Sequence, residues 1–137
     1  MLHLQRRQWL EMVAHSFACL PEEACGLLSG WPEGPVERFW PCPNADHSAR
    51  TYAIDGRDLL RVERALDDEG EGAEILGVMH SHTHTDPYPS PTDVERAALL
   101  GSWHFLIVSL RHPEPEARSY RIDDGVVVEE PVVLSER

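Results

Sequence analysis

Two histidines separated by one residue, His80 and His82, are followed after seven further residues by Ser90-Pro-Thr-Asp93. On an extended segment, residues i and i+2 point to the same side, so both imidazoles can share one ion at Zn–N distances of ~2.0–2.1 Å. A strand-to-helix loop can fold Asp93 back towards the histidines as a third ligand. Three protein ligands with an open fourth position are typical of a catalytic zinc site.

Two acidic residues, Glu22 and Glu23, stand where a predicted helix gives way to the apolar segment 24–31. A carboxylate at the edge of an apolar run is partly desolvated, and this environment suits a general base. Taken alone, either residue is more simply explained as a solvated acid at a helix end. Whether either carboxylate can act as a general base therefore depends on the residues that the fold brings near it.

Each half of the histidine–aspartate pattern also has an ordinary explanation. His-x-His arises by chance in a chain with eight histidines. Ser90-Pro-Thr-Asp93 suits a helix start, because Ser is a good N-cap, Pro is favoured at the first position and an acid complements the helix dipole. The two explanations are compatible, since a capping Ser and a ligating Asp can share one turn.

A competing ligand set consists of His82, His84 and Asp86. These residues partly resemble the H-x-H-x-D-H motif of metallo-β-lactamase-like hydrolases. Pro87 occupies the place of the final His, and 137 residues is short for that fold. This alternative predicts that loss of His84 abolishes metal binding, whereas the set of His80, His82 and Asp93 predicts that it does not.

Hydrophobic periodicity predicts alternating helices and strands around these residues. Helices are expected at residues 4–20 and after Asp55 and Ser90, and strands at 24–31, 36–40, 51–54, 74–79, 103–110, 117–122 and 126–133. Such alternation indicates an α/β fold with a mixed sheet, and no linker divides residues 1–137, so we expect a single domain. The strand at 74–79 runs straight into His80, and the third helix carries Asp93.

The composition restricts the partners of the protein. Twelve arginines and no lysine stand against 24 acidic residues, for a net charge of −12. An acidic surface disfavours nucleic acid, and no apolar run approaches the ~18 residues of a membrane span. The N-terminal segment lacks the apolar core of a signal peptide. We therefore expect a cytoplasmic protein with three reduced cysteines and with neither a nucleic-acid nor a membrane partner.

Taken together, three segments resemble the JAMM/MPN+ metalloprotease domain in its compact prokaryotic form. They are Glu23-Ala-Cys-Gly-Leu-Leu-Ser-Gly30, His80-Ser-His82 and Ser90-Pro-Thr-Asp93. The family is marked by a Glu before a C/G-G-L-x-x-G strand, and by H-x-H, seven residues and S-x-x-D. Pro43-Asn44 and Tyr52-x-Ile54-Asp55 are also similar to prokaryotic members, and the resemblance covers about residues 4–122. Thr83 stands directly after the second histidine, where family members commonly have Pro. This difference affects the loop and none of the metal ligands.

This resemblance implies a role for each matching residue. His80, His82 and Asp93 would hold Zn²⁺ with water in the fourth position. Glu23, which lies three residues before Gly26 as the family pattern requires, would act as the general base, and Ser90 would donate a hydrogen bond to the oxyanion. The implied architecture is the cytidine-deaminase-like MPN fold, with a mostly antiparallel curved sheet flanked by helices.

The resemblance also implies a substrate class. The family cleaves the amide bond after the terminal glycine of a ubiquitin-like or sulfur-carrier protein with an extended Gly-Gly-type tail, and its members often pair into homodimers. Hydrolysis of a small amino-acid conjugate of such a carrier is equally open. The alternative is a non-catalytic MPN-type interaction module, but such relatives typically lose the metal ligands that this chain retains.

Overall fold

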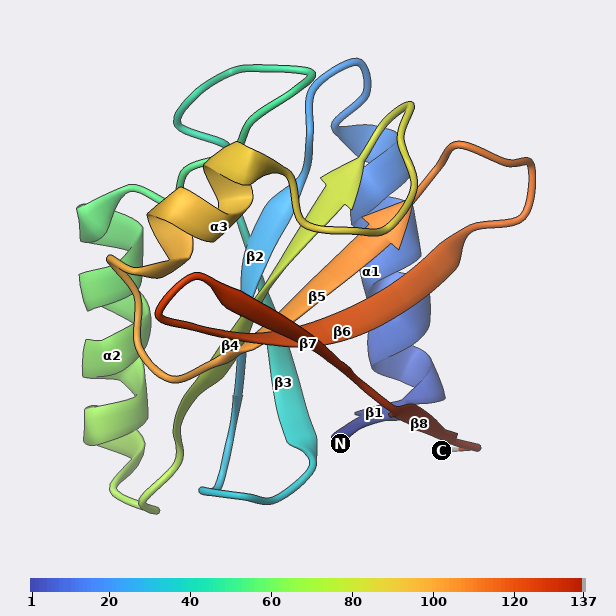
Figure 1. The fold of residues 1–137 in the computed structure, drawn as a ribbon. Helices are drawn as coiled ribbons and strands as arrows, with labels where there is room; N and C mark the ends of the chain where they lie inside the picture. Colours follow the sequence, from blue (N-terminus) through green and yellow to red (C-terminus); the bar gives the residue numbers. More distant parts are fainter. Residues whose placement is uncertain (137) are drawn as a thin grey trace.

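The computed structural model describes residues 1–136, and a six-stranded sheet in the order β3-β2-β4-β5-β6-β7 forms its centre (Figure 1). The strands are β2 (Cys25–Gly30), β3 (Val36–Cys42), β4 (Glu74–His82), β5 (His104–Ser109), β6 (Glu116–Asp123) and β7 (Val126–Glu130). All neighbouring pairs are antiparallel except β4 and β5, which are parallel because the chain crosses over between them through α3 (Pro91–Ala97). The predicted mixed, mostly antiparallel α/β fold is confirmed.

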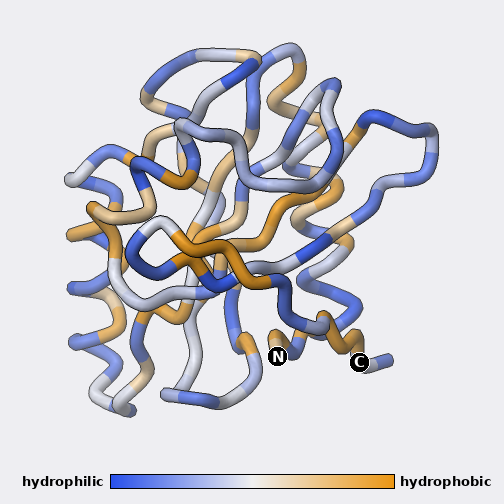
Figure 2. Tube along the Cα trace, viewed as in Figure 1, coloured by the Kyte–Doolittle hydropathy of each residue, from blue (hydrophilic) through white to orange (hydrophobic). Residues whose placement is uncertain are grey.

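Helices cover both faces of this sheet (Figure 1). Successive strand residues point to opposite faces, so Leu27 and Val78 pack with α2 (Gly56–Glu69), whereas Leu28 and Met79 pack with α1 (Arg6–Ala18). Burial on both sides explains the unbroken apolar runs of the central strands. In Figure 2 hydrophobic residues gather in these strands, while the loops at the top and right of the view are mostly hydrophilic.

The two helices that follow predicted N-caps are confirmed. Asp55 accepts a hydrogen bond from the Arg57 backbone at 2.8 Å and starts α2, which ends at Gly70 in the left-handed conformation with φ 67°. Ser90 caps α3. Among residues 1–136, none of the helices combines the length and apolarity needed to cross a bilayer.

Among the predicted elements, two boundaries and one strand are wrong. The first helix begins at Arg6 rather than at residue 4, because Leu2–Gln5 forms β1, which pairs in parallel with β8 (Val132–Ser135). Pro131 divides the strand expected at 126–133 into β7 and β8, since proline cannot donate to the ladder. Residues 51–54 are not a strand, because the backbone of this segment bonds to the loop around Asn44 instead.

Candidate active site

The end of β4 and the start of α3 bring three potential ligands together. His80 and His82 alternate with buried residues of β4 and share the sheet face of Val78, the face that α2 and α3 cover. His80 pairs with Cys25 of β2 and His82 pairs with Ser109 of β5, so both histidines lie at the C-terminal end of a central strand of the sheet. Asp93 is the third residue of α3 and is buried against them.

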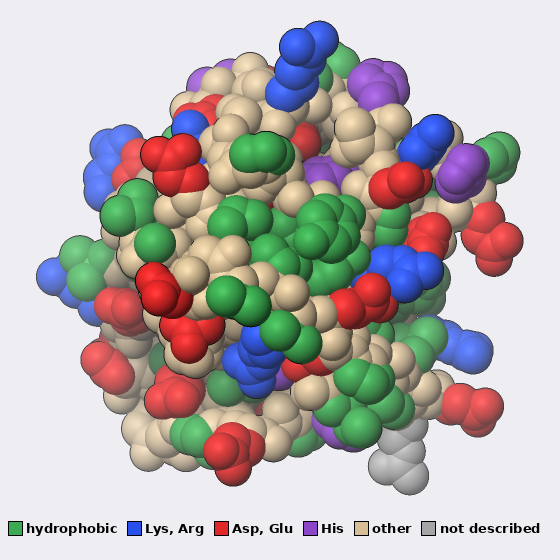
Figure 3. Space-filling model, viewed as in Figure 1, with side chains coloured by type: hydrophobic (Ala, Val, Ile, Leu, Met, Phe, Trp, Pro, Cys, Tyr) green, Lys and Arg blue, Asp and Glu red, His purple; other side chains and the backbone are tan. Residues whose placement is uncertain are grey.

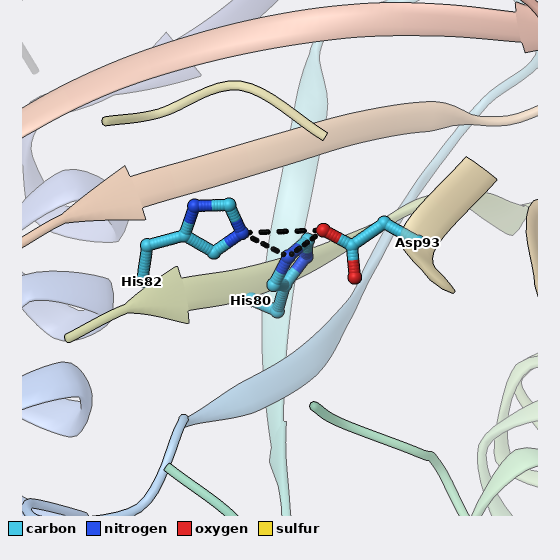
Figure 4. A group of neighbouring side chains, drawn as sticks. All are labelled: His80, His82 and Asp93. Carbon is cyan, nitrogen blue, oxygen red and sulfur yellow. Dashed lines mark hydrogen bonds and ion pairs between the residues drawn. The ribbon is translucent and has the colours of Figure 1, made fainter. Parts of the chain in front are cut away.

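The donor atoms of these three side chains converge on one point (Figure 4). Nε2 of His80 lies 3.1 Å from Nε2 of His82 and 3.1 Å from Oδ2 of Asp93, and Nε2 of His82 lies 3.2 Å from the same oxygen. In a tetrahedral site with bonds of ~2.0–2.1 Å, neighbouring ligand atoms stand roughly 3.3–3.4 Å apart. Two imidazole nitrogens and one carboxylate oxygen at this spacing therefore fit a zinc ion with a fourth position left open.

The electrostatics of the group also suit a cation. Burial tends to raise the pKa of Asp93, but hydrogen bonds with both imidazoles and the Ser90 amide hold that pKa far below its ordinary value. Burial lowers the pKa of His80. For His82, burial lowers the pKa, but the hydrogen bonds to Asp93 and to the Asp86 carbonyl and the nearby Glu23 and Asp93 charges together outweigh burial and raise it. The carboxylate is thus anionic at neutral pH and faces two ring nitrogens.

Outer contacts fix the orientation of both rings. Nδ1 of His82 donates to the backbone carbonyl of Asp86 at 2.8 Å, which leaves Nε2 with a lone pair directed into the group. His80 stacks on Tyr52, with ring centroids 4.1 Å apart and an interplanar angle of 16°. Nδ1 of His80 is buried and has no hydrogen-bond partner within residues 1–136.

Glu23 is a buried carboxylate beside this group. It is only 3% exposed, and its Oε1 has no hydrogen-bond partner in the part of the chain that the structure describes. Burial raises its pKa to about 8, with the nearby His82 opposing and Asp93 adding to the shift. Glu22, by contrast, is part-exposed, and its Oε1 lies 3.4 Å from Nδ1 of His47. Of the two acids, Glu23 has the environment that a general base needs.

Ser90 lies three residues before Asp93 and shares two hydrogen bonds with it. Its hydroxyl oxygen accepts from the Asp93 amide at 3.0 Å, and its own amide donates to Oδ2 of Asp93 at 2.9 Å. This reciprocal capping box leaves the hydroxyl proton of Ser90 free to donate. Helix capping and a contact with substrate are therefore compatible, as the sequence indicated.

The competing ligand set is not brought together. His84 and Asp86 are exposed, and the Asp86 carboxylate accepts a hydrogen bond from Arg111 at 2.8 Å. Among residues 1–136, the one cluster with metal-ligand spacing is His80, His82 and Asp93. The contribution of Asp86 is its backbone carbonyl, which orients His82.

The loop at residues 83–89 is tied to the neighbouring strands. Ser109 donates to the carbonyl of Thr85 at 2.6 Å, and the Tyr120 hydroxyl donates to the carbonyl of Pro87. In Figure 3 one group of histidine atoms is recessed in the upper part of the surface, while other histidine side chains protrude around it. Sequence reasoning missed these two hydrogen bonds, because backbone acceptors leave no trace in residue type. It also missed the stacking of Tyr52 on His80, because this contact joins distant segments of the chain.

Comparison with known proteins places this arrangement in a family. Residues 5–123 match the model of prokaryotic homologs of the JAB domain. The CysO-cysteine peptidase of Mycobacterium tuberculosis is 46% identical over 129 residues, which cover 92% of this chain and 86% of that protein. The probable TtuB-protein conjugate cleaving protease of Thermus thermophilus is 38% identical over 97 residues, which cover 70% of this chain and 63% of that protein.

A solved structure shows the same fold. The solution structure of a Desulfitobacterium hafniense protein superposes with a TM-score of 0.90 and 38% identity, and the match covers 100% of this chain and 94% of the other. Family match, sequence identity and fold agree over most of the chain. The chain therefore belongs to the prokaryotic JAB family, as a compact JAMM/MPN domain of the peptidase type.

Proposed function

We propose that this chain is a zinc-dependent peptidase that hydrolyses the amide bond after the C-terminal glycine of a ubiquitin-like or sulfur-carrier protein conjugate. One observation carries the proposal: Glu23, a buried carboxylate whose Oε1 has no hydrogen-bond partner among residues 1–136, lies beside the converging donor atoms of His80, His82 and Asp93. The substrate class is supported by relatives that are named for cleaving CysO-cysteine and TtuB conjugates.

Each residue has a distinct part in the proposed reaction. Zinc held by His80, His82 and Asp93 would lower the pKa of a water ligand towards ~7 and polarise the scissile carbonyl. Glu23 accepts the proton of the attacking water and then delivers it to the leaving amine. Burial raises its pKa above the ordinary carboxylate value, which strengthens it as a proton acceptor. The Ser90 hydroxyl donates to the carbonyl oxygen as negative charge develops there.

The test compares two neighbouring carboxylates. Glu23→Gln removes the proton acceptor but none of the three ligands, so we expect zinc content to stay at the wild-type level while kcat falls by about 10²–10⁴-fold. Glu22→Gln removes the part-exposed acid next to it and should leave kcat close to wild type. The measurements are cleavage of carrier-protein conjugates bearing either cysteine or a lysine-linked peptide, and zinc per chain.

Two results would contradict the proposal. A Glu23→Gln protein that cleaves at the wild-type rate would show that another group moves the proton. A zinc-loaded wild type that binds the carrier protein but cleaves neither conjugate would favour the non-catalytic interaction module.

A further inference from the structure

One buried side chain organises the loop that borders Glu23. Asn44 is 7% exposed, and both ends of its amide are fully used. Its Nδ2 donates to three backbone carbonyls, those of Glu23 and Thr51 at 3.0 Å each and that of Ser48 at 3.4 Å. Its Oδ1 accepts from two backbone amides, those of Asp46 at 3.0 Å and Ala53 at 3.2 Å.

These bonds form one side of a clamp on the backbone of Glu23 and Ala24. On the loop side, Asn44 holds the carbonyl of Glu23, and the Glu23 amide donates to the carbonyl of Ser48 at 2.8 Å. On the sheet side, the Ala24 amide donates to the Ser81 hydroxyl at 2.8 Å, and the Ser81 amide donates to the Ala24 carbonyl at 2.9 Å. Ser81 stands between His80 and His82, so the sheet side ties Glu23 to the proposed ligands.

The clamp acts on the backbone that carries the Glu23 carboxylate. Oε1 of this carboxylate has no hydrogen-bond partner among the residues that the structure describes. A catalytic group has to be held within about 0.5 Å of its productive geometry. Because no hydrogen bond within that part of the chain holds Oε1, the position of the carboxylate depends on the Glu23 backbone and on the packing around the buried side chain.

We propose that Asn44 is a positioning residue that fixes Glu23 beside the metal site through the Glu23 backbone carbonyl. Asn44 acts through Glu23 and touches none of the reacting atoms. The inference rests on the proposed function, because it assigns a role relative to Glu23 as the general base. It predicts that loss of the Asn44 donor lowers kcat while KM and zinc content stay unchanged.

The chain offers a matched control within the same loop. The Ser48 hydroxyl accepts hydrogen bonds from the amides of Arg50 and Thr51 at 3.0 and 3.2 Å. Ser48→Ala therefore loosens the loop, but it leaves the Ser48 carbonyl that receives the Glu23 amide. A purely structural role for the loop predicts similar effects of Ser48→Ala and Asn44→Ala, whereas positioning of Glu23 predicts different ones.

Two substitutions of Asn44 keep the test decisive. Asn44→Ala removes all five hydrogen bonds. Asn44→Asp retains an oxygen to accept from Asp46 and Ala53, but it places a second oxygen against the carbonyls of Glu23 and Thr51. Asn44→Asp thus preserves part of the loop should Asn44→Ala fail to fold. We expect kcat to fall by about 10- to 100-fold in both, the scale expected for misplacing a catalytic group.

The readouts are kcat, KM, zinc per chain and melting temperature for the full-length proteins, with wild type and Glu23→Gln measured alongside. The expected result is a loss of kcat in both Asn44 variants at unchanged KM and zinc content, with a clearly smaller loss of kcat in Ser48→Ala. Wild-type kcat in Asn44→Asp, or an equal loss in Ser48→Ala, would overturn this inference alone. Failure of the zinc-loaded wild type to cleave would overturn the proposed function and this inference with it.

Discussion

At the residue scale, Asp93 combines two functions that a substitution can separate. Its Oδ2 faces both histidines and also accepts the Ser90 amide. Asp93→Asn keeps an oxygen for the Ser90 amide but removes the charge, and a neutral amide is a poor zinc ligand. We expect zinc to fall from about one per chain towards zero, and the metal-free protein to melt at a lower temperature, because the charge that Asp93 presents to both imidazoles is lost. Elemental analysis and melting in chelator measure the two effects.

The control for Asp93 is the exposed histidine of the competing ligand set. His84→Ala should retain wild-type zinc, because His84 lies outside the cluster of donor atoms. Zinc retained in Asp93→Asn but lost in His84→Ala would move the metal to His82, His84 and Asp86 and refute the proposed ligands.

The clustering of His80, His82 and Asp93 was predictable from sequence to the extent that their spacing has a local geometric meaning. The two-residue period of a strand puts His80 and His82 on one face, and a capped helix start turns Asp93 back towards them. The roles of Asn44 and of the Asp86 carbonyl were not predictable in this way. Both act on backbone groups in other segments, and only the folded chain defines those contacts.

At the element scale, the start of α3 tests whether the Ser90 hydroxyl does more than cap a helix. Ala at an N-cap costs about 1 kcal/mol relative to Ser, whereas Gly costs only a few tenths. Ser90→Ala and Ser90→Gly both remove the hydroxyl, so a donor role in the reaction predicts the same loss of kcat in both. The free energy of unfolding should fall clearly only in Ser90→Ala, as denaturant titration can measure.

The opposite pattern would refute the catalytic role of Ser90. If kcat follows the free energy of unfolding, so that Ser90→Gly keeps wild-type activity, then the hydroxyl serves the helix alone. Ser90→Thr supplies the control, because it retains both the capping oxygen and the donor and should keep most of the activity.

The helices and strands themselves were predictable where one signal dominates. The Asp55 cap and the spacing of Val62 and Leu66 locate α2. At the N-terminus two signals compete, because Leu2 and Leu4 are buried with strand alternation immediately before a helix. Pairing of β1 with β8 decides between them, and a contact between the two ends of the chain lies outside any local window.

At the scale of the whole molecule, the candidate active site and the pairing of the chain ends occupy opposite ends of the fold (Figure 1). A buried carboxylate, Glu130, connects the last strand of the sheet to its neighbours. It accepts from Nδ1 of His104 at 2.6 Å, from the Ser119 hydroxyl at 2.8 Å and from the Met1 amino group at 2.7 Å. Burial alone would raise the pKa of Glu130, but these hydrogen bonds lower it from its ordinary 4.5 to about 2.

This shift predicts how the stability of the fold depends on pH. A carboxylate with a depressed pKa in the folded state stabilises the protein above its unfolded-state pKa, and this contribution is lost as the pH falls through the folded-state value. Glu130 should therefore contribute up to about 3 kcal/mol at neutral pH, lost between about pH 4.5 and pH 2. Glu130→Gln should be less stable than wild type at pH 7, with the difference shrinking across that range.

Denaturant titrations at a series of pH values measure this difference directly. The control is Glu129→Gln, which removes the neighbouring acid from its exposed pair with Arg118. Exposed pairs contribute little, so Glu129→Gln should track wild type at every pH. A constant gap between wild type and Glu130→Gln from pH 7 to pH 2 would mean that Glu130 stabilises the fold by packing rather than by its charge. The acid sensitivity of the molecule would then have to arise from its other carboxylates.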